Sequence, residues 1–152
     1  MIVATPLVLS GCQTGKPGVS NDTYTGVTTY YSGIVDANSG LLMNLKSQAI
    51  YSDKLGYGVK TNYFSSASGW MFLESAYAGG RQYNYDVTDR QTAMCSGTGC
   101  VTIEKGFIHM TESEFAKAAE TGFDFKLIGS RGSVTGRIEP AVFQQVTSQR
   151  TG

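Results

Sequence analysis

The chain has 152 residues, which suits one domain with its own core, since a domain of this size buries about two-thirds of its unfolded surface. Its 12 Lys and Arg balance 12 Asp and Glu, so no net charge draws the protein to nucleic acid, and we expect no nucleic-acid partner. Nineteen Gly, nine Tyr and seven Phe favour many short strands joined by tight turns. Composition therefore predicts a mainly β fold.

The first residues have the pattern of an export signal. Residues 2–9 form an apolar run that is much shorter than the roughly 20 residues of a membrane-spanning helix. The run ends in four residues that resemble the lipobox of bacterial lipoproteins: Leu9, Ser10, Gly11 and Cys12. This resemblance implies cleavage before Cys12 and transfer of a diacylglyceryl group to its thiol. We therefore expect a signal peptide over 1–11, truncated at its start because no Lys or Arg precedes Lys16.

The segment after Cys12 indicates where the protein resides. Residues 13–23 are polar and rich in turn-forming residues, so we expect a flexible tether over 12–23. Resemblance to enteric-type lipoprotein sorting implies, from Gln13 after the cysteine, an outer-membrane protein that faces the periplasm. The alternative is a buried first strand with an ordinary thiol at Cys12, but Pro6 cannot donate a hydrogen bond within a central strand. We expect a protein of the bacterial cell envelope, anchored to a membrane by lipid on Cys12.

The two remaining cysteines bracket a short loop. If lipidation uses Cys12, then Cys95 and Cys100 remain as a pair. The residues between them, 96–99, include two glycines, which permit the positive φ angles of a hairpin tip. We expect a structural disulfide with Cα atoms about 5 to 6 Å apart. A zinc site would need a second pair of ligands, and a thioredoxin-like redox site would need a different spacing, so we expect no metal here.

Runs rich in β-branched and aromatic residues alternate with turn-forming residues along most of the chain. They predict antiparallel strands over 24–35, 41–51, 57–65, 70–78, 83–94 and 101–109. The last two strands should pair through the loop between the cysteines.

The chain continues with one clear helix. Thr111 and Glu114 form a capping box, and Gly122 suits a left-handed end, so the sequence predicts a helix over 112–121. Two strands and a short C-terminal helix should follow, at 123–128, 134–138 and 141–146. These elements predict a single antiparallel β-sheet or sandwich domain, mainly β and α+β at the margin, over 24–146, with a tail over 147–152.

The second half of the chain carries a further pattern of residues. It consists of Trp70, Phe72, Arg90, the loop from Cys95 to Cys100, Glu104, Thr111 with Glu114, and Lys126 to Gly132. This pattern, which covers about half of the chain, is similar to small uncharacterised lipoproteins of proteobacterial envelopes. The resemblance implies a location in the envelope and no particular activity.

No set of residues has the pattern of a catalytic site. His109 is the only histidine, and the chain has neither a Gly-x-Ser-x-Gly motif nor a second histidine for a metal. Carboxylates of the predicted hairpin could act as a pair, as in glycoside hydrolases: Asp86 with Asp89 or Glu104. Cross-strand ion pairs with Arg81 or Arg90 explain these carboxylates equally well. We expect no enzymatic activity, no metal and no cofactor.

Seven aromatic residues could form a platform for a glycan or a partner strand: Tyr24, Tyr30, Tyr31, Tyr51, Tyr57, Tyr63 and Trp70. Because strand residues alternate between faces, we expect about half of the rings to be buried, and a partner or ligand surface at Tyr30, Tyr31 and Trp70. The leading hypothesis is a non-enzymatic accessory or interaction module that binds another envelope protein or a glycan. The alternative is a small envelope hydrolase or glycan-binding protein that uses surface carboxylates and aromatics. A deep pocket with two carboxylates about 5 to 9 Å apart would favour the enzyme.

Overall fold

The computed structural model describes residues 15–66, 69–97 and 99–152. The fold is mainly β, with 60% of the described residues in strands and 16% in helices, which confirms the fold class expected from the sequence. The elements follow in chain order: β1 (Gly18–Asn21), β2 (Thr28–Tyr31), β3 (Val35–Ser39), β4 (Met43–Ser52), β5 (Gly56–Ser65), β6 (Leu73–Ala78), β7 (Arg81–Tyr83), β8 (Tyr85–Ser96), β9 (Gly99–Met110), α1 (Glu112–Thr121), β10 (Phe123–Gly129), β11 (Gly132–Ile138) and α2 (Pro140–Thr151).

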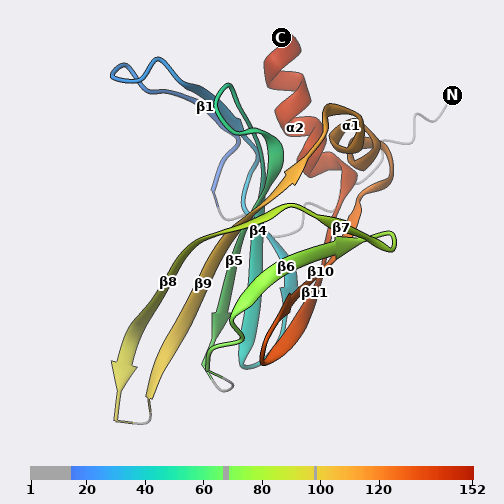
Figure 1. Ribbon diagram of the computed structural model, residues 1–152. Helices are drawn as coiled ribbons and strands as arrows, with labels where there is room; N and C mark the ends of the chain where they lie inside the picture. The colour runs from blue at the N-terminus through green and yellow to red at the C-terminus, as the bar shows by residue number, and fades with distance from the viewer. Residues whose placement is uncertain (1–14, 67–68, 98) are drawn as a thin grey trace, which may run out of the picture.

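The strands form two antiparallel sheets that share one core (Figure 1). The larger sheet has the order β1-β2-β4-β5-β9-β8, and β3 pairs with β4 beside this path. The smaller sheet has the order β11-β10-β6-β7. Both helices lie toward one end of the larger sheet, which we call the helix end (Figure 1). The connections β3–β4, β5–β6, β8–β9 and β10–β11 lie at the opposite end, which we call the loop end (Figure 1).

Strand register assigns the residues of the larger sheet to two faces. Leu45, Tyr63 and Glu104 pair directly across β4, β5 and β9, so their side chains share one face. This inner face packs against the smaller sheet and the helices in a core that includes Leu45, Tyr63, Leu73, Phe115, Leu127 and Phe143. The next residues along the same strands, Lys46, Asn62 and Lys105, also pair with one another and point to the opposite, outer face.

The helix predicted over 112–121 is confirmed, because α1 spans Glu112–Thr121. The Thr111 hydroxyl accepts a hydrogen bond from the Glu114 N–H at 3.2 Å, and the Glu114 carboxylate accepts one from the Thr111 N–H at 2.8 Å. This capping box satisfies backbone donors that would otherwise lack partners at the start of the helix. Phe115 and Ala118 then bury one side of α1 in the core.

The C-terminal helix is longer than the predicted 141–146 and takes in most of the predicted tail. It reaches Thr151 because long-range contacts hold its later turns. The Gln145 side-chain oxygen accepts a hydrogen bond from the Gly33 N–H at 2.9 Å, and the Gln149 amide donates to a backbone carbonyl of β2 at 3.3 Å. A local sequence pattern cannot predict these contacts, because their partners lie more than 100 residues away in the sequence.

The prediction of a single strand over 24–35 is wrong. The region forms a hairpin of β1 and β2, and β3 follows as a separate strand. A carboxylate oxygen of Asp22 accepts hydrogen bonds from the N–H groups of Tyr24 and Thr25 at 2.9 and 3.4 Å, which stabilises the turn between β1 and β2. Because β1 falls within 12–23, part of the expected tether belongs to the larger sheet.

Candidate functional site

Glu104 is a carboxylate on the inner face of the larger sheet, with only 2% of its surface exposed. It accepts hydrogen bonds from the backbone N–H groups of Met71 and Leu73 at 2.8 and 2.9 Å, and from Arg90 Nε at 3.4 Å. Arg90 also donates from Nη2 to the Leu73 carbonyl at 2.9 Å. We call Glu104, Arg90 and the backbone of residues 71–73 the Glu104 clamp.

The clamp holds a backbone conformation that is rare for residues other than glycine. Phe72 has a φ angle of 54°, and the amides on either side of it both donate to the Glu104 carboxylate. The guanidinium groups of Arg90 and Arg131 lie 5.5 and 5.3 Å from the centre of the Phe72 ring. Charge-assisted hydrogen bonds thus offset the cost of burying Glu104 and join β9 to the chain that enters β6. Glu104 therefore holds the two sheets together.

The expectation that Glu104 is a surface carboxylate is wrong, and it cannot pair with Asp86 or Asp89. Strand register places Asp86 and Asp89 on the outer face, whereas Glu104 faces the core, so the sheet separates them. Asp86 lies 2.6 Å from His109 Nε2, and Asp89 lies 3.9 Å from Lys105 Nζ. Each candidate carboxylate therefore has a partner in the fold, and the acid pair of a glycoside hydrolase does not form here.

His109 lies on the outer face of β9, opposite Gly58 of β5. Its ring contacts the Phe107 ring at 4.8 Å and bonds to Asp86. Among the residues that the structure describes, no hydroxyl or thiol hydrogen-bonds to the His109 ring, so the nucleophile of a triad is missing from this pair. Within the same ranges, no three His, Cys, Asp or Glu side chains gather as metal ligands.

A shallow groove of about 550 Å³ runs between α1 and the β6–β7 hairpin, and two carboxylates line it. One of them, Glu114, caps α1 and forms an ion pair with Arg81. The other, Asp124, lies 2.7 Å from Arg137 Nη1. Because arginines hold both groups, the groove does not offer the free acid and base that glycoside hydrolysis requires.

The structure does not bring Tyr30, Tyr31 and Trp70 together as one surface. Tyr30 belongs to a row of rings at the helix end, with centres 6.2, 4.5 and 5.0 Å apart in the order Tyr30, Tyr51, Tyr57 and Phe115. Tyr31 is half-buried on the opposite face of β2. Trp70 lies before β6, outside the strand predicted over 70–78, and stacks on Phe72 at 6.2 Å.

Three of the exposed large apolar side chains lie at the loop end, while Val19, Tyr24, Leu55 and Val87 belong to β1, the β1–β2 turn, the β4–β5 turn and β8. Leu41 and Leu42 in the β3–β4 connection are 98% and 54% exposed, and Met94 near the tip of the β8–β9 hairpin is 73% exposed. Together with Phe64 and Val101 they border a shallow hollow of about 220 Å³. We call these five residues the apolar end.

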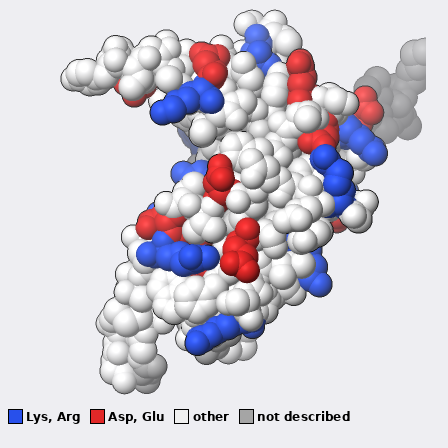
Figure 2. All heavy atoms as spheres, in the orientation of Figure 1, with Lys and Arg blue, Asp and Glu red and all other residues white. Residues whose placement is uncertain are grey.

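Sequence reasoning missed the apolar end, although the sequence contains a signal for it. The segments 37–45, 61–73 and 91–103 contain no Asp, Glu, Lys or Arg. The fold brings the described residues of these three segments together at the loop end. Figure 2 shows the result for the β8–β9 hairpin, whose projecting end at the lower left carries no charged side chain.

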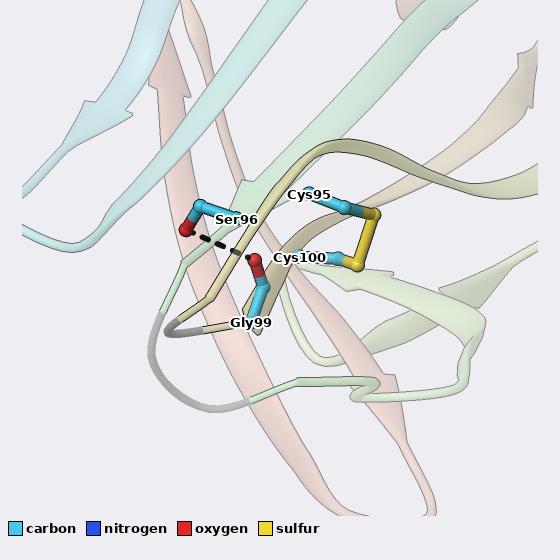
Figure 3. Close-up of a disulfide and its surroundings, with 4 residues drawn as sticks. All are labelled: Cys95, Ser96, Gly99 and Cys100. Atoms are coloured by element: carbon cyan, nitrogen blue, oxygen red, sulfur yellow. Dashed lines mark hydrogen bonds between the residues drawn. A yellow bond between two sulfur atoms is a disulfide. The ribbon is translucent and has the colours of Figure 1, made fainter.

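The predicted pairing of Cys95 with Cys100 is confirmed in its geometry, because the two sulfur atoms lie 2.11 Å apart (Figure 3). The Cα atoms are 4.0 Å apart, closer than the expected 5 to 6 Å. The strand register shifts between Ala93 and Ser96, so Met94 and Cys95 together face Cys100. This bulge draws the two cysteines together at the base of the hairpin tip.

No protein-family model, curated protein or solved structure matches the chain. In the described ranges, no helix is both long and apolar enough to cross a bilayer. Cys12 and the expected signal peptide lie outside those ranges.

Proposed function

We propose that this chain is a lipid-anchored protein of the bacterial cell envelope, held by Cys12, that acts as a non-enzymatic accessory or interaction module. The sequence at residues 9–12 supports the anchor. The bonded sulfur atoms of Cys95 and Cys100 agree with an exported protein, because disulfides persist in oxidising compartments such as the periplasm. Gln13 favours the outer membrane, by its resemblance to sorting signals.

One observation carries the choice of an interaction module over a hydrolase. The candidate catalytic carboxylates Asp86, Asp89 and Glu104 all have partners within the fold, while large apolar side chains stand exposed at the loop end. An enzyme needs free, convergent polar groups, whereas a surface that contacts another component needs exposed apolar area. The described residues offer exposed apolar area.

Fractionation of cells that carry the full-length chain tests the anchor. The unaltered protein should sediment with membranes and dissolve only in detergent, while Cys12→Ser should lose lipid attachment. A variant with Cys95→Ser and Cys100→Ser is the matched control, since it removes thiols of the same kind and should stay in the membrane fraction. Recovery of the unaltered protein in the soluble periplasmic fraction would contradict the proposal.

Crosslinking in those cells, followed by affinity purification, tests the role as an interaction module. We expect a crosslinked envelope protein or glycan that is recovered with the full-length chain and is absent from cells that lack the chain. Hydrolysis of peptidoglycan or of a glycan by the purified protein would instead establish the enzyme.

A further inference from the structure

The apolar end is formed by side chains from separate parts of the chain. Leu41 and Leu42 come from the β3–β4 connection, Phe64 from β5, and Met94 and Val101 from the β8–β9 hairpin. Asn44 pairs with Phe64, and Phe64 pairs with Ile103, so Phe64 belongs to the outer face, which neither the smaller sheet nor the helices cover. The exposed leucines therefore lie beside the outer face of the larger sheet, on which Ile103 is itself buried.

Met94 adds an independent sign of function. Its φ angle is 48°, a left-handed conformation that side chains with a Cβ rarely adopt. The bulge beside the Cys95–Cys100 bond holds Met94 in this conformation with 73% of its surface exposed. Backbone strain that is fixed by neighbouring structure tends to occur where a protein contacts a ligand or partner. Here the strained residue presents an apolar side chain to solvent.

The charge distribution indicates what such a surface contacts. The sequence segments that contribute the five residues of the apolar end, 37–45, 61–73 and 91–103, contain no charged residue, and the nearby β10–β11 turn adds only Arg131. Because these segments contain no Asp or Glu, they bring no negative charge that phospholipid headgroups would repel. The fluid surface of a bilayer can also receive hairpin tips that project separately, with apolar side chains below the headgroups and polar backbone above.

The tether also limits how far the domain can lie from a membrane, and this step rests on the proposed anchor at Cys12. The described chain begins at Gly15, where an added Cβ would lie 3.7 Å from the Ile34 side chain. Ile34 borders a small hollow on the outer face together with Lys46, Gln48 and Lys60. Gly15 lies three residues after Cys12, so their Cα atoms are at most about 11 Å apart.

This maximum distance between Cys12 and Gly15 is shorter than the length of the strands in the larger sheet. From the level of Gln48 to the start of β4 at Met43, the strand extends about 17 Å toward the loop end. A lipid at Cys12 would therefore hold the outer face near Gly15 within about 11 Å of the bilayer, and the loop end reaches the same bilayer when the strands lie along its surface. We infer that the apolar end inserts into the interfacial layer of the phospholipid bilayer that carries the lipid on Cys12, as a second point of contact.

A fluorophore at a single new cysteine tests this insertion on the mature lipoprotein in phosphatidylcholine vesicles that contain no other protein. Leu42→Cys places a polarity-sensitive nitrobenzoxadiazole label at the apolar end, and Leu55→Cys places the same label on an exposed leucine at the opposite end. We expect a blue shift and a rise in emission at position 42, and emission typical of water at position 55. Emission typical of water at both positions, or a blue shift only at position 55, would overturn the inference.

A second variant and a mass measurement separate the possible causes. Adding Leu41→Ser and Met94→Ser to the position-42 sample should remove the blue shift, while adding Val19→Ser, an exposed apolar residue of β1, should leave it. A blue shift that requires an added envelope protein would show a protein site and overturn the inference. The mass of the same sample shows whether Cys12 carries lipid. If it carries none, the proposed anchor is wrong. The labels can then be read on the unmodified chain mixed with vesicles, and they still test insertion of the apolar end.

Discussion

The two ends of the larger sheet differ in what covers their apolar side chains. At the helix end, Tyr51 and Tyr57 pack in a row with Phe115, and Phe143 from α2 meets Phe115 at 5.1 Å. At the loop end, Leu41 and its neighbours are left in water. The same strands run through both ends, so the difference lies in what covers them. Apolar residues under the helices stabilise the fold, whereas those at the loop end are free to contact something else.

The loop end is nevertheless held firmly. The Glu104 clamp fixes the chain that enters β6, and the disulfide closes the tip of the β8–β9 hairpin. Exposed side chains on such a base lose little conformational freedom when they bind, which favours binding. Loss of stability on substitution should therefore follow packing and the clamp, and contact with other molecules should follow the exposed leucines.

The largest effect is expected at the helix end. Phe143→Ala removes a fully buried ring, which costs about 3 to 5 kcal/mol of the free energy of unfolding because a cavity remains. Urea unfolding followed by circular dichroism measures the change, with Phe143→Leu as the conservative control. A loss below about 1 kcal/mol would show that the helices do not close the core.

The clamp should give the next largest effect. Glu104→Ala leaves two buried N–H groups and the Arg90 guanidinium without their carboxylate partner, and we expect a loss of about 3 kcal/mol. Glu104→Gln keeps an acceptor and should lose less. Hydrogen exchange should show faster exchange of the Leu73 amide in Glu104→Ala than in Phe143→Leu. Unchanged protection of that amide would contradict the clamp.

How much of this could be predicted from sequence depends on how local each feature is. The capping box of α1 and the loop between Cys95 and Cys100 are local, and both were predicted, although the bulge that brings the Cα atoms to 4.0 Å was not. The burial of Glu104 was missed because its partners, Met71 and Leu73, lie more than 30 residues away. The apolar end was missed for a different reason: its uncharged segments are visible in the sequence, but their meeting depends on sheet register.

Removing the disulfide should have a smaller effect than either change above. Cys95→Ser with Cys100→Ser opens a ring of few residues, so we expect a loss of about 2 kcal/mol or less and an intact fold. Thiol counting on unfolded protein from the envelope, with and without reductant, should show the pair oxidised in the unaltered chain. Two free thiols at these positions would remove this support for an exported location.

Tyr85 offers a test against pH. Burial raises the pKa of Tyr85, so above pH of about 10 the unfolded chain loses this proton before the folded chain does. Stability should be at its full value below that pH and should fall as the pH rises through the folded pKa. Tyr85→Phe should remove this part of the fall and, by losing the contact with Thr61 at 3.2 Å, cost about 1 kcal/mol at neutral pH. Unfolding curves at pH 8 to 11 measure the fall of stability with pH and the loss at neutral pH. If stability falls with pH as steeply in Tyr85→Phe as in the unaltered chain, Tyr85 is not the cause of the fall.

The smallest effect on stability is expected at the apolar end. Leu41→Ser with Leu42→Ser should change the free energy of unfolding by no more than about 0.5 kcal/mol, because both side chains are exposed already. Leu55→Ser should behave in the same way. If the double variant is much less stable than Leu55→Ser, these leucines belong to the core and their exposure has no meaning for binding.

The mass of the mature protein extracted from membranes tests the lipid anchor most directly. We expect a chain that begins at Cys12 and carries a diacylglyceryl group on that residue, with the lipid removed by Cys12→Ser and kept when Cys95 and Cys100 are replaced. An unmodified thiol at Cys12, or a chain that still begins at Met1, would contradict the lipid anchor.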